Sequence, residues 1–513
     1  MTGIKPAGSA SNPCKIDIFE LFSDRRTKKT DGGEEIGFDL SPYIAAVDYY
    51  EDVFSPTITM KVMILNESQN VKDQTEEEDE LVGIEPTEAK DTDFKALYDG
   101  LPIRVGERCK IKIGSNSETN IQLDFTEEER YLFVTNVTNI VRDAKRELFT
   151  LHLTSREAVI NETSRVYKRF NPDQRIDASV KQILKDNLNV GEDYSRVDPT
   201  ANSYGFIGNL RKPFATLVWL AKKSVTTTNG GKSAGFLFYQ TKSGFNFRSV
   251  DSLMRQNRYK VKNQDGEEQV STDKMQYTYS EATASFSPDG DTGFNAINND
   301  FKILRFSFTR NNDLIKDLRM GTFCSSGMYF NPFTFKFETN VYKRKDYVSK
   351  DEVARMGDET YVPLKLRKEG DATIEDTATR ALTGVIDVGV YARKDTDLIK
   401  KSDPLAHQMQ SISRYNTLFA NLIDMVVPLN SNLEAGMVVE CLFPKMSTTA
   451  RTGRLEDLQR SGSYIIKELC HHYDIEKSYT SMKLMKDYPG ENKDRVEESD
   501  DPVTIIDPAT IGL

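Results

Sequence analysis

The sequence predicts an α+β protein that is mostly β, with two β-barrel domains, a small helical or mixed domain and a mixed middle domain. Short runs of alternating apolar residues occur near both ends of the chain, and a stretch with helical periodicity lies between them. The composition is globular, with 38% hydrophobic and 10% aromatic residues. A chain of 513 residues normally forms several hydrophobic cores, so we expect a multidomain protein.

The clearest strand-rich stretch lies at residues 401–488. Met437–Phe443 is a short apolar run that Pro444 ends, because proline cannot donate a hydrogen bond to a neighbouring strand. Gly462–Leu469 and Ser478–Met485 have the same character, with turn residues between them. A helix over Asp403–Tyr415 and a strand over 423–427 would precede these runs. We predict a β-barrel domain from these segments.

Residues 14–162 predict a second β-barrel domain, the first in chain order. Cys109, Ile111 and Ile113 alternate with lysines, as in a strand that buries one face. Tyr131–Val137 and Leu148–Thr154 are predicted to pair as a hairpin around a charged tip. Residues 66–93 interrupt this domain with an insertion that includes five consecutive acidic residues, and such a charge run favours a solvated loop.

Residues 163–235 have the periodicity of helices. One apolar stripe consists of Ile176, Val180, Ile183, Leu184 and Leu188. A second helix begins at Pro213, a residue favoured in the first helical turn. Its predicted buried face consists of Phe214, Leu217, Val218 and Ala221, and we expect Trp219, the single tryptophan, to pack there.

Residues 236–400 predict a β-rich middle domain with a charged linker, and residues 489–513 an acidic tail. A hairpin over 236–248 turns at Lys242-Ser243-Gly244. Further strands are expected at 301–310, 328–330 and 333–338, with a helix at 313–319. The linker is assigned to 343–376, which is charged and poor in aromatic residues.

Charge and cysteine usage exclude several classes of protein. The net charge of −11 disfavours nucleic-acid binding by release of counterions. Five widely spaced cysteines without a C-x-x-C pair indicate neither a disulfide framework nor a zinc cluster. Because the chain has no uncharged apolar run near 18 residues and no apolar N-terminal segment, we expect no membrane span and no signal peptide.

Three sequence motifs resemble chemical sites but are incomplete. Gly231-Lys232-Ser233 lacks the upstream glycine of a phosphate-binding loop, and Asp289–Gly293 lacks the closing glutamate of a calcium loop. Cys470-His471-His472 with Asp474 is a cluster of possible metal ligands, but successive side chains of a strand point to opposite faces, so adjacent histidines cannot easily bind one ion. His152 and His407 are isolated. We therefore predict no catalytic, cofactor-binding or metal-binding residues and no cofactor.

Three separate stretches resemble one protein family. They are "LPIRVGERCKIKI" with "YLFVTNVTNIVRD" and "LFTLHLTSREAVINETSRVYKRF", then "KPFATLVWLAKKSV" with "GFLFYQTKSGFNFRSVDSLM", and finally "NLEAGMVVE" with "SGSYIIKELCHHY" and "YTSMKLMKD". All three are similar to the central baseplate hub protein of contractile-tailed, T-even-like bacteriophages. That family is related to the N-terminal part of secretion-system spike proteins.

The resemblance implies a structural protein rather than an enzyme. It implies two tail-tube-like barrel domains in each subunit of a homotrimer, which adapts a sixfold tail tube to a threefold central spike and surrounds the channel for genome ejection. The implied partners are the tail tube protein, the central spike protein, baseplate wedge proteins and the tape measure protein, with DNA only in transit. The implied location is the virion baseplate, after assembly in the host cytoplasm.

Three alternatives remain open at this stage. A tail-associated peptidoglycan hydrolase would need a pair of carboxylates, and 79 acidic residues leave many candidate pairs. A spike component of a contractile secretion system would normally continue into a long repetitive β-needle. A binding protein of the cytoplasm is the third alternative.

Overall fold

The computed structural model describes most of the chain from Cys14 to Gly490. The described residues are 14–23, 28–29, 35–67, 71–72, 94–95, 97–100, 103, 105–115, 122–143, 146–227, 233–256, 260–262, 268–270, 275–279, 301–311, 313–332, 335–348, 353–357, 373–386, 404–443, 457, 459–474 and 477–490. Most of the predicted insertion 66–93, residues 231–232, Asp289–Gly293 and residues 491–513 lie outside them.

The first strand-rich region confirms the predicted β character of residues 14–162. Its neighbouring strands run antiparallel in the order β5-β6-β12-β11-β9-β1-β4, with β10 beside β9. Cys109, Ile111 and Ile113 are buried, as their alternation predicts. The strands are β1 (Cys14–Phe22), β4 (Phe38–Asp39), β5 (Ile44–Asp52), β6 (Thr59–Glu67), β9 (Arg108–Ser115), β10 (Leu123–Phe125), β11 (Leu132–Arg142) and β12 (Arg146–Ser155).

The two ends of this sheet lie close together. β4 and β5 stand at opposite ends of the strand order, yet only Leu40 and the short helix η1 (Ser41–Tyr43) connect them along the chain. The backbone N–H of Leu40 also donates to the carbonyl oxygen of Phe19 at 2.8 Å. Because so few residues span only a short distance, the sheet must curl strongly.

The second strand-rich region contains β20 (Gln276–Thr278), β21 (Arg305–Asn311), β25 (Asn421–Pro428), β26 (Val438–Leu442), β27 (Gly462–Asp474) and β28 (Tyr479–Lys486). Their order is β21-β25-β28-β27-β26-β20. The residues just before β21 also bond to β20, since Thr278 N donates to Phe301 O and Ile303 N to Thr278 O, both at 3.0 Å. The first and last strands of this order are therefore connected as well.

The two regions share one strand order. When six strands of each region are numbered along the chain (β1, β5, β6, β9, β11, β12 and β20, β21, β25, β26, β27, β28), both have the order 2-3-6-5-4-1. All neighbouring pairs are antiparallel except β20 with β26, which is parallel. Residues 312–420 separate strands 2 and 3 of the second region, whereas a short turn separates them in the first.

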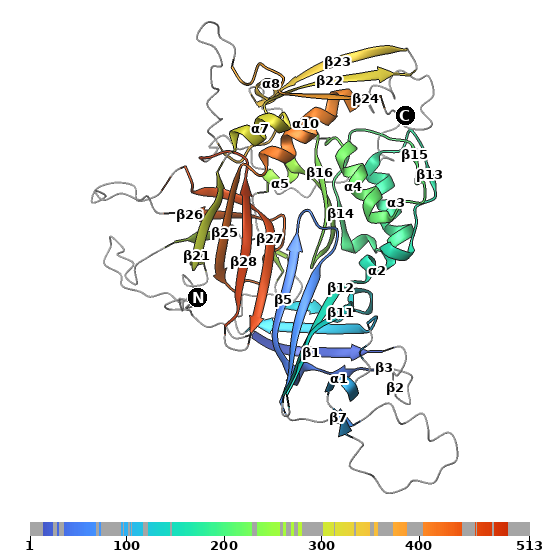
Figure 1. Cartoon of the computed structure of the whole chain (residues 1–513), viewed down its shortest axis with the longest axis vertical. Helices are drawn as coiled ribbons and strands as arrows, with labels where there is room; N and C mark the ends of the chain where they lie inside the picture. Colours follow the sequence, from blue (N-terminus) through green and yellow to red (C-terminus); the bar gives the residue numbers. More distant parts are fainter. Residues whose placement is uncertain are drawn as a thin grey trace, which may run out of the picture.

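A single strand joins the two regions edge to edge. Residues Glu468–Asp474 of β27 pair antiparallel with Ala46–Asp52 of β5. The result is one continuous sheet of 14 strands, in which the red β27 lies beside the blue β5 (Figure 1). The buried core of the first region includes Tyr473 from β27, so the two cores also share side chains.

A helical layer covers one side of this sheet (Figure 1). It contains α2 (Arg156–Thr163), α3 (Ile176–Leu188), α4 (Pro213–Lys223) and the hairpin of β16 (Phe236–Thr241) and β17 (Gly244–Ser249). The predicted stripe of α3 is buried, and α4 begins at Pro213 as expected. The hairpin shares its core with the helices, although the predicted boundary at 235 separates them.

The predicted face of α4 is wrong at one residue. Val218 remains 36% exposed, and Leu220 is buried instead. The buried face is centred between Leu217 and Leu220, and at 100° per residue Val218 lies outside it. Trp219 packs at the margin, against the rings of Tyr204 and Phe206.

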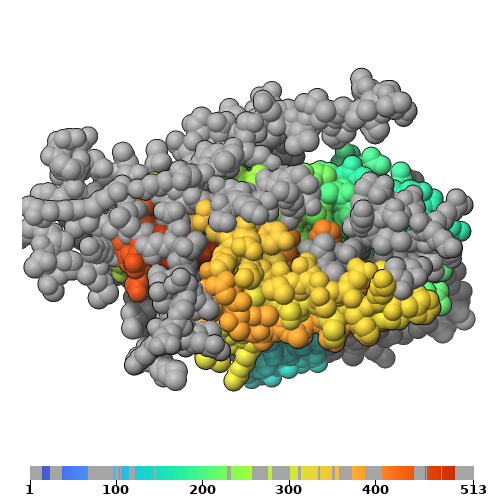
Figure 2. All heavy atoms as spheres, turned by 90° about the horizontal axis from the view of Figure 1, so that it is seen from above, coloured from blue at the N-terminus to red at the C-terminus, as the bar shows by residue number. Residues whose placement is uncertain are grey.

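A third body is inserted between β21 and β25. It contains the sheet β23 (Lys336–Lys343), β22 (Cys324–Asn331) and β24 (Arg380–Val385), with α7 (Leu314–Met320), α8 (Arg344–Val348) and α10 (Pro404–Thr417). Figure 2 shows this body, in yellow and orange, on the face seen from above. A buried ion pair of 2.9 Å between Arg414 of α10 and Asp251 of α5 (Val250–Met254) holds it to the helical layer.

The remaining described elements are short. They are β2 (Lys28–Lys29), β3 (Glu35–Ile36), β7 (Val71–Lys72), β8 (Phe94–Lys95), α1 (Leu97–Gly100), η3 (Glu128–Arg130), β13 (Arg169–Phe170), η4 (Glu192–Tyr194), β14 (Ser195–Val197), β15 (Phe206–Ile207), β18 (Lys260–Lys262) and β19 (Glu268–Val270). Among the described helices, none has the length and apolar character needed to cross a bilayer.

Substitution of Gly244 tests how tightly the β16–β17 turn is fixed. Gly244 has φ +125°, and a Cβ there would overlap the carbonyl oxygen of Tyr194. We expect Gly244→Ala to lower the free energy of unfolding by at least about 2 kcal/mol more than Gly106→Ala. Gly106 is the matched control, since it has φ +97° with no atom within 4 Å of the added Cβ. Equal losses for the two variants in urea unfolding would contradict this packing.

Candidate functional site

A densely bonded polar site lies where three distant segments meet. These segments are the end of β5, the turn between β16 and β17, and the loop 430–436 that leads into β26. We call this site the three-way junction, and its central side chains are Glu51, Lys242, Glu434 and His471. It connects the first strand-rich region, the helical layer and the second strand-rich region at one place.

Glu51 is the centre of the three-way junction. It is only 2% exposed, and its side chain comes from the inward face of β5. Its Oε1 accepts from the backbone N–H of Lys242 at 2.6 Å and from the hydroxyl of Tyr49 at 2.7 Å. Its Oε2 accepts from the backbone N–H of Ala435 at 2.7 Å. One carboxylate thereby binds backbone groups of the other two segments.

Lys242 binds the loop from the opposite direction. Its Nζ donates to the carbonyl oxygen of Ser431 and, at 3.4 Å, to that of Leu433. It also lies 3.8 Å from a carboxylate oxygen of Glu434, which accepts from the hydroxyl of Ser243. The turn residues Lys242 and Ser243 are thus attached to the second region by side chains, while Gly244 supplies the backbone conformation.

His471 completes the three-way junction from β27. It is fully buried and stacks on Tyr49 with ring centroids 6.1 Å apart. Its Nε2 lies 3.2 Å from the carbonyl oxygen of Leu433, and its Nδ1 lies 3.0 Å from the hydroxyl of Thr480. Since a carbonyl can only accept, Nε2 carries the proton and Nδ1 accepts from Thr480.

Burial dominates the electrostatics of these groups. Loss of solvation, with the charge of Glu434 as the second cause, raises the pKa of Glu51. Burial, reinforced by the positive charge of Lys242, lowers the pKa of His471 to about 3. The imidazole is therefore neutral at physiological pH, in agreement with a hydrogen bond that Nδ1 accepts from Thr480.

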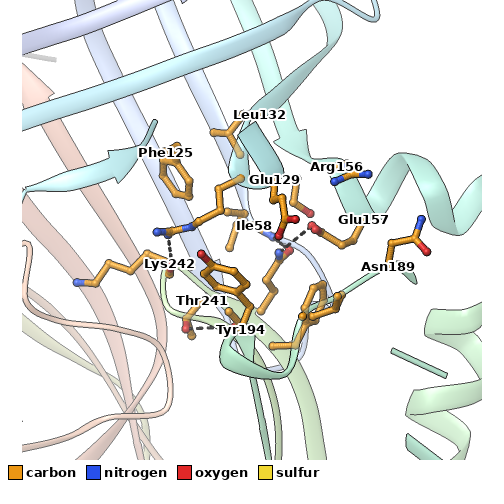
Figure 3. A pocket seen from close by; sticks show the side chains of 17 residues that line it. Ile58, Phe125, Glu129, Leu132, Arg156, Glu157, Asn189, Tyr194, Thr241 and Lys242 are labelled. Atoms are coloured by element: carbon orange, nitrogen blue, oxygen red, sulfur yellow. Dashed lines mark hydrogen bonds between the residues drawn. The ribbon is translucent and has the colours of Figure 1, made fainter. Parts of the chain in front are cut away.

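A small cavity lies next to the three-way junction (Figure 3). Its volume is about 40 Å³, which is room for a few water molecules. Glu157 lines it and accepts from Gln240 at 3.3 Å, and burial raises the pKa of this carboxyl. Arg130 lies over the Phe125 ring and donates to the carbonyl oxygen of Lys242. Arg130 thereby joins the first region to the hairpin, and Glu157 joins α2 to it.

The Cys470–Asp474 segment belongs to β27, which continues beyond the predicted strand Gly462–Leu469 and includes Asp474, where the sequence predicts a turn, and the side chains of this segment diverge. His471 points into the core, whereas His472 bonds to Asp48 at 2.6 Å on the other face of β27. Among the residues that the structure describes, no group of three or more His, Cys, Asp or Glu side chains could hold a metal ion. His152 bonds to Thr138 at 2.8 Å, far from His471 along the chain.

Sequence reasoning missed the residues that matter most here. The sequence pattern predicts only a turn at Lys242-Ser243-Gly244, and it does not single out Glu51. The sequence carries a signal for Glu51, because this acidic residue continues the alternation of the inward-facing Val47 and Tyr49 in β5. Its partners in the loop 430–436 are more than 370 residues away, and strand periodicity alone does not pair such segments.

Glu51→Gln tests the carboxylate at the centre of the three-way junction. The side-chain amide would place its own NH₂ group against the backbone N–H of Lys242 or of Ala435, each of which now donates a hydrogen bond to Glu51. We expect a loss of about 1–3 kcal/mol in the free energy of unfolding, measured by urea titration. Glu20→Gln is the control, since Glu20 forms a half-exposed ion pair of 3.4 Å with Lys110 and should cost about 0.5 kcal/mol or less. Similar stability of the two variants would contradict the assigned role.

His471→Gln tests the buried imidazole through pH. The folded-state pKa of about 3 lies below the ordinary value of 6.5, so between these values the unfolded state binds a proton that the folded state does not. Stability supplied by His471 is therefore present above pH 6.5 and is lost as the pH falls. Between pH 7 and pH 5 we expect wild type to lose about 2 kcal/mol more than His471→Gln, which keeps both hydrogen bonds. Parallel stability curves for the two proteins would show that His471 titrates normally.

Comparison with known proteins gives structural likenesses only. No family model matches the chain, and no curated protein matches it. The 43 kDa tail protein of prophage MuSo2 from Shewanella oneidensis is similar over 92% of this chain and 100% of its own, with 10% identity and a TM-score of 0.45. The tail protein from Neisseria meningitidis MC58 is similar over 93% of this chain and 97% of its own, with 9% identity and a TM-score of 0.44.

A third likeness is to a secretion-system component. The Escherichia coli protein is described as part of the type VI secretion system and as similar to the T4 bacteriophage tail proteins gp27 and gp5. It is similar over 89% of this chain and 75% of its own, with 7% identity and a TM-score of 0.37. Two of these three structures are described as tail proteins and the third as a component of the type VI secretion system.

Proposed function

We propose that this chain is a structural baseplate hub of a phage contractile tail and not an enzyme. As a trimer, it would adapt a sixfold tail tube to a threefold central spike and surround the channel for genome ejection. The observation that carries the proposal is the common 2-3-6-5-4-1 strand order of the two strand-rich regions. The sequence resemblance to the hub family is a second, independent support.

The common strand order supports two barrel domains in each subunit. Both regions connect the ends of their strand order, through η1 in the first and through residues 301–303 in the second. Three chains with two such domains would present six similar edges to a sixfold tube, while a threefold partner could bind the other side. A single domain in each chain would not resolve this mismatch of symmetry.

The strand pairing also suggests revised domain boundaries. We propose that the second barrel comprises β20, β21 and residues 421–488, so that the predicted middle domain 236–400 contributes two strands to it. The helical domain would then extend from 156 to the end of α5 at Met254, because the hairpin shares its core with α3 and α4. The insertion between β21 and β25 would form the remaining domain.

The proposed partners follow from this role. The tail tube protein would bind one end of the trimer and the central spike protein the other, with wedge proteins around it and the tape measure protein inside the tube. An acidic chain, with net charge −11, suits a channel through which DNA slides without binding. The proposed location is the virion baseplate, with assembly in the host cytoplasm.

Measurement of the mass in solution tests the proposed assembly. We expect light scattering of the purified full chain to give three times the chain mass of 58.2 kDa. The value should stay constant over dilution, since a hub that joins a tube to a spike needs a stable assembly. A constant mass of one chain at micromolar concentration would contradict the proposal.

A further inference from the structure

The sheet of β23, β22 and β24 in the inserted body has two unlike faces. On one face the hydroxyl of Tyr329 donates to Gln408 of α10, and a Cβ on Gly327 would meet the side chain of Met409 at 3.2 Å. Figure 1 shows α10 directly below this sheet. The opposite side, which we call the outer face, is turned away from α10.

The outer face is apolar and carries no charge. Residues that stand opposite each other in neighbouring strands point to the same side of a sheet, so the strand registers assign nine residues to this face. Four large apolar side chains among them are between 44% and 67% exposed. An uncharged apolar patch of this kind marks a contact surface. The nine residues are Ser326, Met328, Phe330, Phe337, Thr339, Val341, Ala381, Thr383 and Val385.

The turn between β22 and β23 extends the outer face. Phe335 is 80% exposed and has φ +55°, a backbone conformation that bulky side chains rarely adopt. Its ring centroid lies 6.3 Å from that of Phe330, which in turn lies 5.4 Å from that of Phe337. Three aromatic rings therefore form one exposed apolar cluster at this end of the sheet.

The chain leaves its last strand, β28, beside the same sheet. The guanidinium of Arg344, the first residue after β23, lies 5.4 Å from the ring centroid of Tyr488. The carboxylate of Asp487 accepts from the backbone N–H groups of Met356 at 3.1 Å and Gly357 at 3.3 Å, and both residues belong to the inserted body. The sequence after Gly490 therefore continues from a point next to the end of β23.

That sequence contains an uncharged run rich in β-branched residues. Residues 491–501 are mostly charged, Pro502–Ile506 (Pro-Val-Thr-Ile-Ile) is uncharged, and Asp507 ends the run. The intervening segment 491–502 can span about 40 Å when extended, whereas a strand of the length of β22 spans only about 26 Å. The run has five residues, as does the part of β22 under the outer face, Ser326–Phe330.

We infer that Pro502–Ile506 binds the outer face of the β23-β22-β24 sheet in the same chain. The run and the face agree in polarity, because both are apolar and neither contains a charge. They also agree in length, and the chain enters beside the sheet through a linker that is long enough to reach every part of it. The inference does not depend on the number of chains in an assembly, so it stands apart from the proposed function.

Oxidation of Met328 by dilute hydrogen peroxide tests this contact in the full chain. Met63 on β6 is the internal reference, because it is 40% exposed and Met328 is 44% exposed. When Pro502–Ile506 covers the outer face, we expect Met328 to be oxidised at least about fivefold more slowly than Met63, as measured by peptide mass spectrometry. In the variant Ile505→Asp/Ile506→Asp the two rates should agree within about twofold, since carboxylates are costly to bury on an uncharged face.

Hydrogen exchange gives a second readout from the side of the sheet. We expect Val385→Asp to raise the exchange rate of the backbone amides of residues 503–506 at least about tenfold relative to wild type. Val141→Asp is the matched control, because Val141 and Val385 are both 59% exposed and Val141 lies on β11 in the first region. This control should leave the exchange of residues 503–506 unchanged.

Three results would overturn the inference. One is equal oxidation of Met328 and Met63 in wild type, and another is protection of Met328 that persists in Ile505→Asp/Ile506→Asp, since a different surface would then cover the sheet. The third is protection that is lost on dilution, because a segment of the same chain binds independently of concentration. None of these results changes the mass expected for the assembly, so the proposed function is tested separately.

Discussion

The pairing of β27 with β5 is the constraint on which the rest of the structure depends. β27 is long enough to pair with both regions, because its first residues pair with β26 in the second region and its last seven pair with β5 in the first. Backbone ladders fix both distance and direction, so this pairing sets the orientation of one region relative to the other. The side chains at the same place, Tyr473 in the first core and His471 in the three-way junction, then add burial and specific hydrogen bonds.

The polar groups of the three-way junction fix the position of the helical layer relative to the two strand-rich regions. Burial of a carboxylate is costly unless its oxygens are bonded, and Glu51 satisfies this with groups from three segments. A shift of the β16–β17 turn would leave Glu51 and the backbone of loop 430–436 without partners. The buried carboxylate is stable only when all these hydrogen bonds form, so it favours one arrangement of the two strand-rich regions and the helical layer.

Much of the local structure was predictable from the sequence. Strand alternation at Cys109, Ile111 and Ile113 and the stripe of α3 gave correct elements, because burial on one side leaves a clear period. The predicted burial of Val218 was wrong, because the buried face of α4 includes Leu220 and does not extend to Val218. The family resemblance implies two similar domains, but the local sequence pattern does not give their common strand order, because β20 is only three residues long and 109 residues separate β21 from β25. The roles of Glu51 and Lys242 could not be predicted either, because their hydrogen-bond partners lie far away in the sequence and meet only in the folded chain.

The central claim is that the two strand-rich regions are equivalent units within one ring. A reconstruction of the purified assembly by electron cryomicroscopy tests it most directly, since it shows both regions of each chain at once. The account predicts a ring in which first and second regions alternate at equal radius, related by a rotation of about 60°, the angle that six equivalent units in a closed ring require. A ring built from first regions alone, with the second regions at a different radius, would contradict it.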